Sequence, residues 1–264
     1  TVLGLRAEQW EATDGTTNFS ASKQLSHPDR RETWYSPKGA VSWQWLDDTV
    51  LKASVGRAVR MPTVGELYGA TTNSSTSQFI NDPNLRPEVS RSFELAAEKF
   101  WGEHWLRASL FRDDVKDTIL RQTDSTVTPS VTRVSNVDRV LTNGLELVWQ
   151  LRDAGIKNLD IGGSATWADA VVKANAANPA QVGKRWLRIP KQRYSLQASY
   201  RPHAQWLLGA AWRWSGRMYN TELNIDTNPD TYGGTSRVNQ LDLKAAWKFA
   251  KHWEWSLGIN NVTN

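Results

Sequence analysis

The sequence predicts an all-β protein, an antiparallel transmembrane β-barrel of which this chain forms a part. Three observations support this fold class. Apolar and polar residues alternate along most of the chain, the connections between expected strands alternate between long and short, and tryptophans gather where the strands end. Helical spacing of apolar residues fits none of the strongly patterned segments well.

The expected strands show the period-two alternation of a sheet with one apolar face. In residues 206–215 one phase holds apolar side chains, and the other, after Leu207, holds small or polar ones, ending in Arg213 and Ser215. We expect about eleven strands, within residues 1–10, 40–45, 49–58, 92–98, 105–110, 144–151, 159–167, 193–201, 206–215, 239–249 and 253–260. Asn143-Gly144 resembles a hairpin turn, but a turn there would break the order of the connections, so we expect a continuous strand.

Composition narrows the class of protein without deciding it. The 264 residues include 32 Lys plus Arg and 27 Asp plus Glu, a net charge of +5 with no basic run, so we expect no nucleic-acid partner. Cysteine is absent, which excludes a disulfide framework and a thiolate metal site. No apolar run approaches the roughly eighteen residues of a membrane-spanning helix. The chain starts at Thr1 inside a strand-like pattern, which suggests a fragment.

The connections separate a membrane barrel from a soluble sandwich, whose strands alternate in the same way. Strict alternation of long and short connections places all the long loops at one end of the sheet, as in outer-membrane barrels. The long connections are expected at about 13–31, 61–88, 121–131, 170–190 and 216–236, and the short ones at 47–48, 102–104, 153–157, 202–204 and 250–251.

Aromatic residues indicate what the apolar face contacts. Trp45, Trp101, Trp105, Trp149, Tyr200, Trp206, Phe249 and Trp253 flank the short turns, and Trp167, Tyr194 and Trp214 lie toward the long loops. Two such rings are typical of the two interfaces of a membrane, where indoles and phenols sit at the headgroup level. The apolar face is therefore predicted to contact lipid. A soluble, tryptophan-rich, glycan-binding β protein is the alternative, and it would place its tryptophans in loops and clefts.

No residue pattern indicates catalysis. Asp113, Asp114 and Asp117 have no neighbouring histidine and are expected on a polar barrel face, and His104, His203 and His252 are expected at short turns beside tryptophans. No serine has a recognisable His and Asp partner. We therefore predict a protein that is not an enzyme, with no catalytic residue, no metal site and no cofactor.

Several motifs resemble the barrel of TonB-dependent outer-membrane receptors. They are VGRAVRMPTVGELY, then NDPNLRPEVSRSFELAAEKF with an inward glutamate, and then FRDDVKDTILR, NGLELVW, GSATWADA, LRIPKQR, WRWSGRMYN and GINNVTN. The resemblance covers essentially the whole chain in family order, and residues 81–88 are its most specific piece.

The resemblance implies that residues 1–264 are the C-terminal portion of a 22-stranded plugged barrel, from roughly its eleventh to its twenty-first strand. Because such barrels have an even number of strands, at least one more strand is expected after Asn264. The plug domain, the energy-coupling box, the first strands and the last strand are expected outside this chain. The segment alone should then not transport a solute.

The function that the resemblance implies is active transport of a scarce metal chelate, a ferric siderophore, across the bacterial outer membrane, driven by the TonB complex. Cobalamin or another small solute is the alternative within the family. Lipid and lipopolysaccharide are expected as surroundings. Cationic and aromatic loop residues suit an anionic, often aromatic chelate. The expected ligand-binding residues are Arg217, Tyr219, Asn220 and Asn224 in one loop, and Lys184, Arg185 and Trp186 in another.

Overall fold

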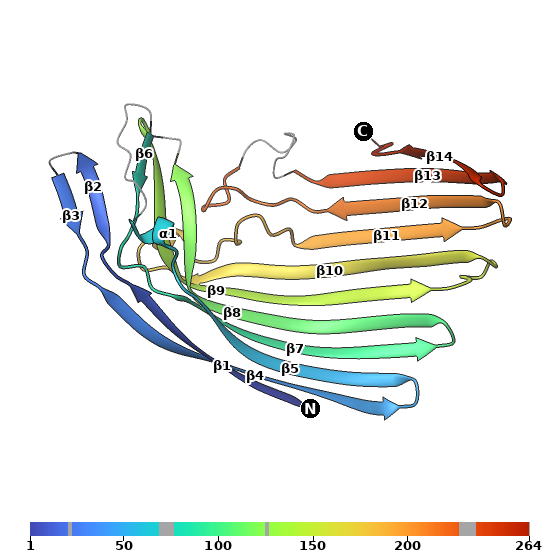
Figure 1. The fold of residues 1–264 in the computed structure, drawn as a ribbon, viewed down its shortest axis with the longest axis horizontal. Helices are drawn as coiled ribbons and strands as arrows, with labels where there is room; N and C mark the ends of the chain where they lie inside the picture. Colours follow the sequence, from blue (N-terminus) through green and yellow to red (C-terminus); the bar gives the residue numbers. More distant parts are fainter. Residues whose placement is uncertain (21–22, 69–76, 125–126, 227–235, 264) are drawn as a thin grey trace.

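The chain forms one antiparallel meander, as a computed structural model shows for residues 1–20, 23–68, 77–124, 127–226 and 236–263. Its strands follow one another in sequence order across a curved sheet (Figure 1). They are β1 (Val2–Ala12), β4 (Arg30–Leu46), β5 (Thr49–Arg60), β7 (Glu88–Trp101), β8 (His104–Asp124), β9 (Ser130–Leu151), β10 (Leu159–Ala174), β11 (Gln192–Tyr200), β12 (Trp206–Ser215), β13 (Val238–Ala250) and β14 (Trp253–Ile259). The eleven expected strands are confirmed.

Smaller elements lie at one end of the meander. They are the hairpin of β2 (Thr16–Ser20) and β3 (Lys23–Ser26), the helix α1 (Val64–Tyr68), the strand β6 (Ser77–Ile80) and a 3-10 helix at Pro179–Gln181. β6 pairs with β9 in parallel, outside the meander. Among the residues that the structure describes, no helix is long and apolar enough to cross a membrane.

The connections confirm the predicted asymmetry. The five short ones, residues 47–48, 102–103, 152–158, 201–205 and 251–252, gather at the end opposite α1 and β6 (Figure 1). One prediction was wrong: the connection expected over 121–131 is much shorter. β8 extends to Asp124 and β9 begins at Ser130, because the two backbones continue to pair beyond the ends of the other strands. β8 is 21 residues long and β9 is 22 residues long.

The strand register gathers the predicted apolar phases onto one face. Tyr194 lies opposite Trp214, and Leu196 opposite Trp212. The same phase continues in every strand from β4 to β14, through Trp43, Leu51, Leu95, Leu110, Leu145, Ala165, Leu243 and Leu257. Many of these side chains are exposed, with 58% of Trp43 and 50% of Leu257 accessible. So broad an exposed apolar face suits lipid contact.

The opposite face carries charged pairs. Lys52 contacts Glu98 at 2.8 Å, and Glu98 is only 7% exposed. The inward glutamate expected in this strand is found: Glu94 and Glu98 share this face, and Glu94 pairs with Arg107. Ionic groups of this kind belong on the lumen side of a barrel, because lipid would leave them without solvation.

Aromatic side chains mark both ends of the apolar face. Near the short turns Trp206 and Trp247 stack with ring centroids 5.6 Å apart. Toward the long loops Tyr194 stacks on Trp214 at 5.2 Å and meets Trp167 edge-on at 5.6 Å. These two rows fit the predicted interfacial rings.

Two glycines make room for aromatic rings between strands. Gly144 lies inside β9, so the Asn-Gly pair forms no turn, as predicted. A Cβ at Gly144 would collide with the ring of Phe111, and one at Gly163 with the indole of Trp149. Glycine at these points lets a neighbouring strand's aromatic ring cover the backbone.

The face assignment predicts that arginine is tolerated differently at two adjacent alanines. Ala210 lies between Ala198 and Leu243 on the apolar face, whereas Ala211 lies between Gln197 and Asp242 on the polar face. We expect Ala210→Arg to cost about 2–4 kcal/mol of folding free energy near the membrane midplane, and Ala211→Arg much less. Denaturant titration of the protein refolded into lipid vesicles measures both. Equal losses would contradict the assignment.

Candidate functional site

The short helix α1 is fixed by a capping box at the long-loop end of the sheet. The Thr63 hydroxyl accepts from the Glu66 amide at 3.2 Å, and a Glu66 carboxylate oxygen accepts from the Thr63 amide at 2.8 Å. Both guanidinium contacts from Arg60 to this carboxylate measure 3.2 Å. Partial burial alone would raise the pKa of Glu66, but the Thr63 amide and Arg60 outweigh it and lower that pKa.

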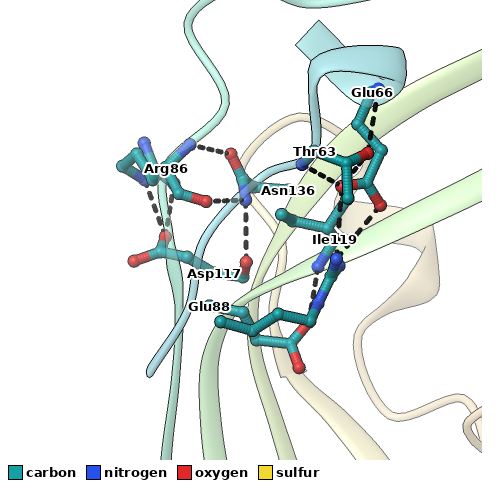
Figure 2. Close-up of polar contacts among 8 residues, drawn as sticks. Thr63, Glu66, Arg86, Glu88, Asp117, Ile119 and Asn136 are labelled. Carbon is teal, nitrogen blue, oxygen red and sulfur yellow. Dashed lines mark hydrogen bonds and ion pairs between the residues drawn. The ribbon is translucent and has the colours of Figure 1, made fainter. Parts of the chain in front are cut away.

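The segment 81–88 is fastened to β8 and β9 through Arg86. The Arg86 amide donates to the Asn136 side-chain oxygen at 2.8 Å, and the Asn136 amide group donates to the Arg86 carbonyl at 2.9 Å (Figure 2). The Arg86 guanidinium contacts Asp117 at 2.7 Å and Asp138 at 3.0 Å. The hydrogen bond with Asp117 raises the pKa of Arg86, so this side chain stays charged.

An apolar cluster lies beneath the same segment. Leu85 is 0% exposed and Leu67 of α1 is 1% exposed, and both pack with Ala12 and Val134. Glu88 adds a hydrogen bond from the Ile119 amide at 3.0 Å. Residues 81–88, the motif with the most specific resemblance to the receptor family, therefore hold this loop in place.

The three aspartates of residues 113–117 are not one cluster. Asp113 accepts from Ser92, Asp114 pairs with Arg139, and Asp117 pairs with Arg86. Asp113 and Asp114 are consecutive strand residues and so project to opposite faces. The prediction that all three aspartates lie on one polar face was wrong. Within the described ranges no group of three or more His, Cys, Asp or Glu side chains could hold a metal ion.

The structure brings together the two predicted ligand-binding segments, 184–186 and 217–224. The Asn224 side-chain oxygen accepts from the Arg185 amide at 2.7 Å, and its amide group donates to the Arg185 carbonyl at 3.1 Å. Asn224 has a positive φ of 58°, a conformation that asparagine tolerates better than most residues. One side chain thus replaces a strand pairing between the two loops.

Further contacts extend this junction. The Arg188 amide donates to the Tyr219 carbonyl at 2.9 Å, and the Arg188 guanidinium donates to the Asn220 side chain at 3.2 Å. The Arg217 guanidinium lies over the Tyr219 ring, 5.1 Å from its centroid, and also donates to the Asp226 carbonyl. Residues 227–235 of the same predicted loop lie outside the described residues.

The seven predicted residues divide into two groups. Asn224 and the backbone of Arg185 hold the junction, and Trp186 packs against a cluster of Val137, Val140 and Val172. Arg217 and Asn220 are exposed, Tyr219 and Lys184 are half-buried, and the buried Nε of Arg185 has no hydrogen-bond partner. The exposed and half-buried group could contact a solute, and its role in binding stays a prediction.

Sequence reasoning assigned no role to the residues that shape this end of the molecule. Arg86, Asp138 and Asp226 anchor loops through contacts with residues distant in the chain or through backbone groups. Only Thr63 and Glu66 carry a local signal, since a threonine followed three residues later by glutamate is a capping-box pattern.

The chain belongs to a known family of outer-membrane proteins. The family model described as "TonB dependent receptor-like, beta-barrel" matches residues 1–262. This family resides in the bacterial outer membrane, and its members are receptors and transporters. The soluble glycan-binding alternative is therefore set aside.

Solved structures share the fold at low sequence identity. The copper transporter OprC matches at a TM-score of 0.71 and 19% identity, over 99% of this chain and 39% of its own. The siderophore receptor PiuA from Acinetobacter baumannii matches at 0.71 and 19%, over 99% and 36%. The ferric enterobactin receptor of Pseudomonas aeruginosa matches at 0.65 and 17%, over 89% and 36%. The chain thus spans well under half the length of these neighbours.

The lowered pKa of Glu66 predicts acid sensitivity of α1. A carboxyl group whose pKa is lower in the fold contributes stability that is complete above its ordinary value of 4.5 and is lost as the pH falls through the folded value. We expect hydrogen exchange in residues 63–68, corrected for its intrinsic pH dependence, to accelerate over that acidic range. Glu66→Gln should remove most of the pH dependence. An unchanged acidic profile in this variant would contradict the role of Glu66.

The Asn224 junction predicts local loosening of two loops together. Asn224→Ala removes the side-chain bonds to both backbone groups of Arg185, and we expect it to cost about 1–3 kcal/mol of local stability. Faster hydrogen exchange at residues 184–188 would report the loss. Leu223→Ala, a change at an exposed neighbour in the same loop, should leave that exchange unaltered. Similar exchange in both variants would show that Asn224 does not join the loops.

Proposed function

We propose that this chain is the C-terminal barrel portion of an outer-membrane receptor that takes up a ferric siderophore by active transport driven by the TonB complex. Family membership supports a receptor of this class. The finer assignment draws on two structural neighbours, a siderophore receptor and a ferric enterobactin receptor. The plug and the energy-coupling segment would be supplied by parts of the receptor other than residues 1–264.

The observation that carries the ligand proposal is the joining of two predicted loops into one surface. Lys184, Arg217 and Tyr219 lie on segments held together by Asn224 and Arg188. Arg217 over the Tyr219 ring presents a cation and an aromatic group side by side. Such a pair suits an anionic chelate with aromatic groups, because charge and stacking then act on one solute. The fixed junction also reduces the ordering cost of binding.

Cobalamin or another small solute is the competing substrate within the family, and one structural neighbour is a copper transporter. A neutral solute would gain little from Arg217 and would depend mainly on stacking against Tyr219. The two residues therefore separate the substrate classes experimentally.

Replacing both Arg217 and Tyr219 by alanine should weaken capture of a ferric chelate. We expect a loss of about 1–3 kcal/mol in whole-cell affinity if either residue is a binding hot spot, with surface abundance unchanged. Binding of radiolabelled ferric enterobactin to cells expressing the full-length receptor measures the loss. Arg201→Ala, at the short-turn end of the sheet, serves as the control.

The single variants then identify the class of solute. A neutral substrate such as cobalamin should lose less from Arg217→Ala than from Tyr219→Ala, whereas an anionic chelate should lose from both. Wild-type affinity in the double variant would remove this loop from the site. The loops nearer residues 61–88 and 170–190 would then remain as candidates.

A further inference from the structure

The apolar face of β7, β8 and β9, which is the outward face of the sheet, changes from apolar to cationic between one row of side chains and the next. These strands lie side by side in the sheet (Figure 1). Leu95, Leu110 and Leu145 form one apolar row across them. The next row toward the long loops contains Arg112 between Phe93 and Asn143. Successive rows on one face lie about 7 Å apart, so this charge borders the membrane-facing surface directly.

Two further rows add charge on the same face. Arg91 and Asp114 lie opposite each other, and Lys116 and Arg139 form the row beyond. We call Arg91, Arg112, Asp114, Lys116 and Arg139 the cationic rows. Four cations and one carboxylate give a net charge of +3.

The single carboxylate of the cationic rows is already occupied. Arg139 contacts Asp114 through two hydrogen bonds, at 2.8 and 2.5 Å. Arg91, Arg112 and Lys116 are exposed, and no carboxylate of the described chain lies within ion-pair distance of them. Crowded like charges on neighbouring strands are unfavourable, so these three cations would be stabilised by an anion from outside the protein.

The charge is concentrated in one sector of the sheet, which Arg57 of β5 extends because it lies opposite Arg91. At the long-loop end of the apolar face, β11, β12 and β13 present Gln192, Trp214 and Asn239 instead. Asp169 on β10 lies beside Asn143 and bounds the cationic rows on that flank. The long-loop end of the apolar face is therefore cationic on β5, β7, β8 and β9, but not at these positions of β11, β12 and β13.

We propose that the cationic rows bind the phosphate groups of a phosphorylated outer-leaflet glycolipid, lipid A. Its acyl chains would cover the apolar row of Leu95, Leu110 and Leu145, and its phosphates would then lie at the height of Arg112 and Arg91. Guanidinium groups bind phosphate in a bidentate manner and retain their charge at any physiological pH. The inference rests on the membrane orientation in the proposed function and is independent of the transported solute.

The test compares two triple variants of the full-length receptor in detergent micelles. One carries Arg91→Gln, Arg112→Gln and Lys116→Gln. The control carries Lys157→Gln, Arg201→Gln and Lys251→Gln, which removes the same charge from exposed residues at the short-turn end. Fluorescently labelled diphosphorylated lipid A is the probe, and heat-modifiable migration on gels checks that each barrel is folded.

We expect the first variant to bind lipid A at least about tenfold more weakly, since each basic residue near an anionic surface contributes measurably to binding, while the control binds like the wild type. Lipid A stripped of phosphate should bind all three proteins equally. Equal affinity of both variants for diphosphorylated lipid A would overturn the proposal. So would full competition by millimolar inorganic phosphate, which would indicate a site for the free anion.

Failure of this test and failure of the transport proposal are distinguishable. Capture of a ferric chelate by the Arg91, Arg112 and Lys116 variant should remain at the wild-type level, because these residues lie on β7 and β8, whereas Asn224 and Arg185 lie in the loops after β12 and β10. Loss of chelate capture with unchanged lipid binding would contradict the proposal by placing these cations at the solute site.

Discussion

Pairing of backbone groups between neighbouring strands is the constraint on which the rest of the structure depends. In lipid an unpaired N–H or C=O has no water to satisfy it, so the sheet must pair along the whole membrane span. Pairing fixes the register, and the register in turn decides which side chains share a face. Leu208, Ala245 and Leu257 meet in adjacent strands for this reason, and Lys52 and Glu98 meet on the other face.

Beyond the apolar band the same sheet meets water, and other interactions replace lipid contact. A strand needs only about 9–11 residues to span the bilayer, so the 21 and 22 residues of β8 and β9 extend well past it. Arg86 and Asn136 fasten a loop to this extension, and an apolar cluster around Leu85 supports it from below. The extension provides a rigid support on which loop residues can be positioned.

The loops gain order from one another as well as from the strands. Asp138 accepts from the amide of Ala176 in the loop after β10, and Asn178 of that loop contacts Glu222 in the loop after β12. A chain of polar contacts therefore runs from Arg86 to the predicted ligand-binding loop. Each of these anchors is shared by two segments, so the loops hold one another in position.

The sequence by itself determined the strands, their apolar faces, the alternation of connections and the continuous strand through Gly144, because period-two alternation is local and survives without knowledge of neighbours. It also pointed to both predicted ligand-binding segments, through their cationic and aromatic residues. The tertiary structure alone decided that Asn224 joins them and that Arg86 bridges Asp117 and Asp138. Those outcomes depend on strand register and on contacts between residues far apart in the chain, and no local pattern of residues encodes such distances.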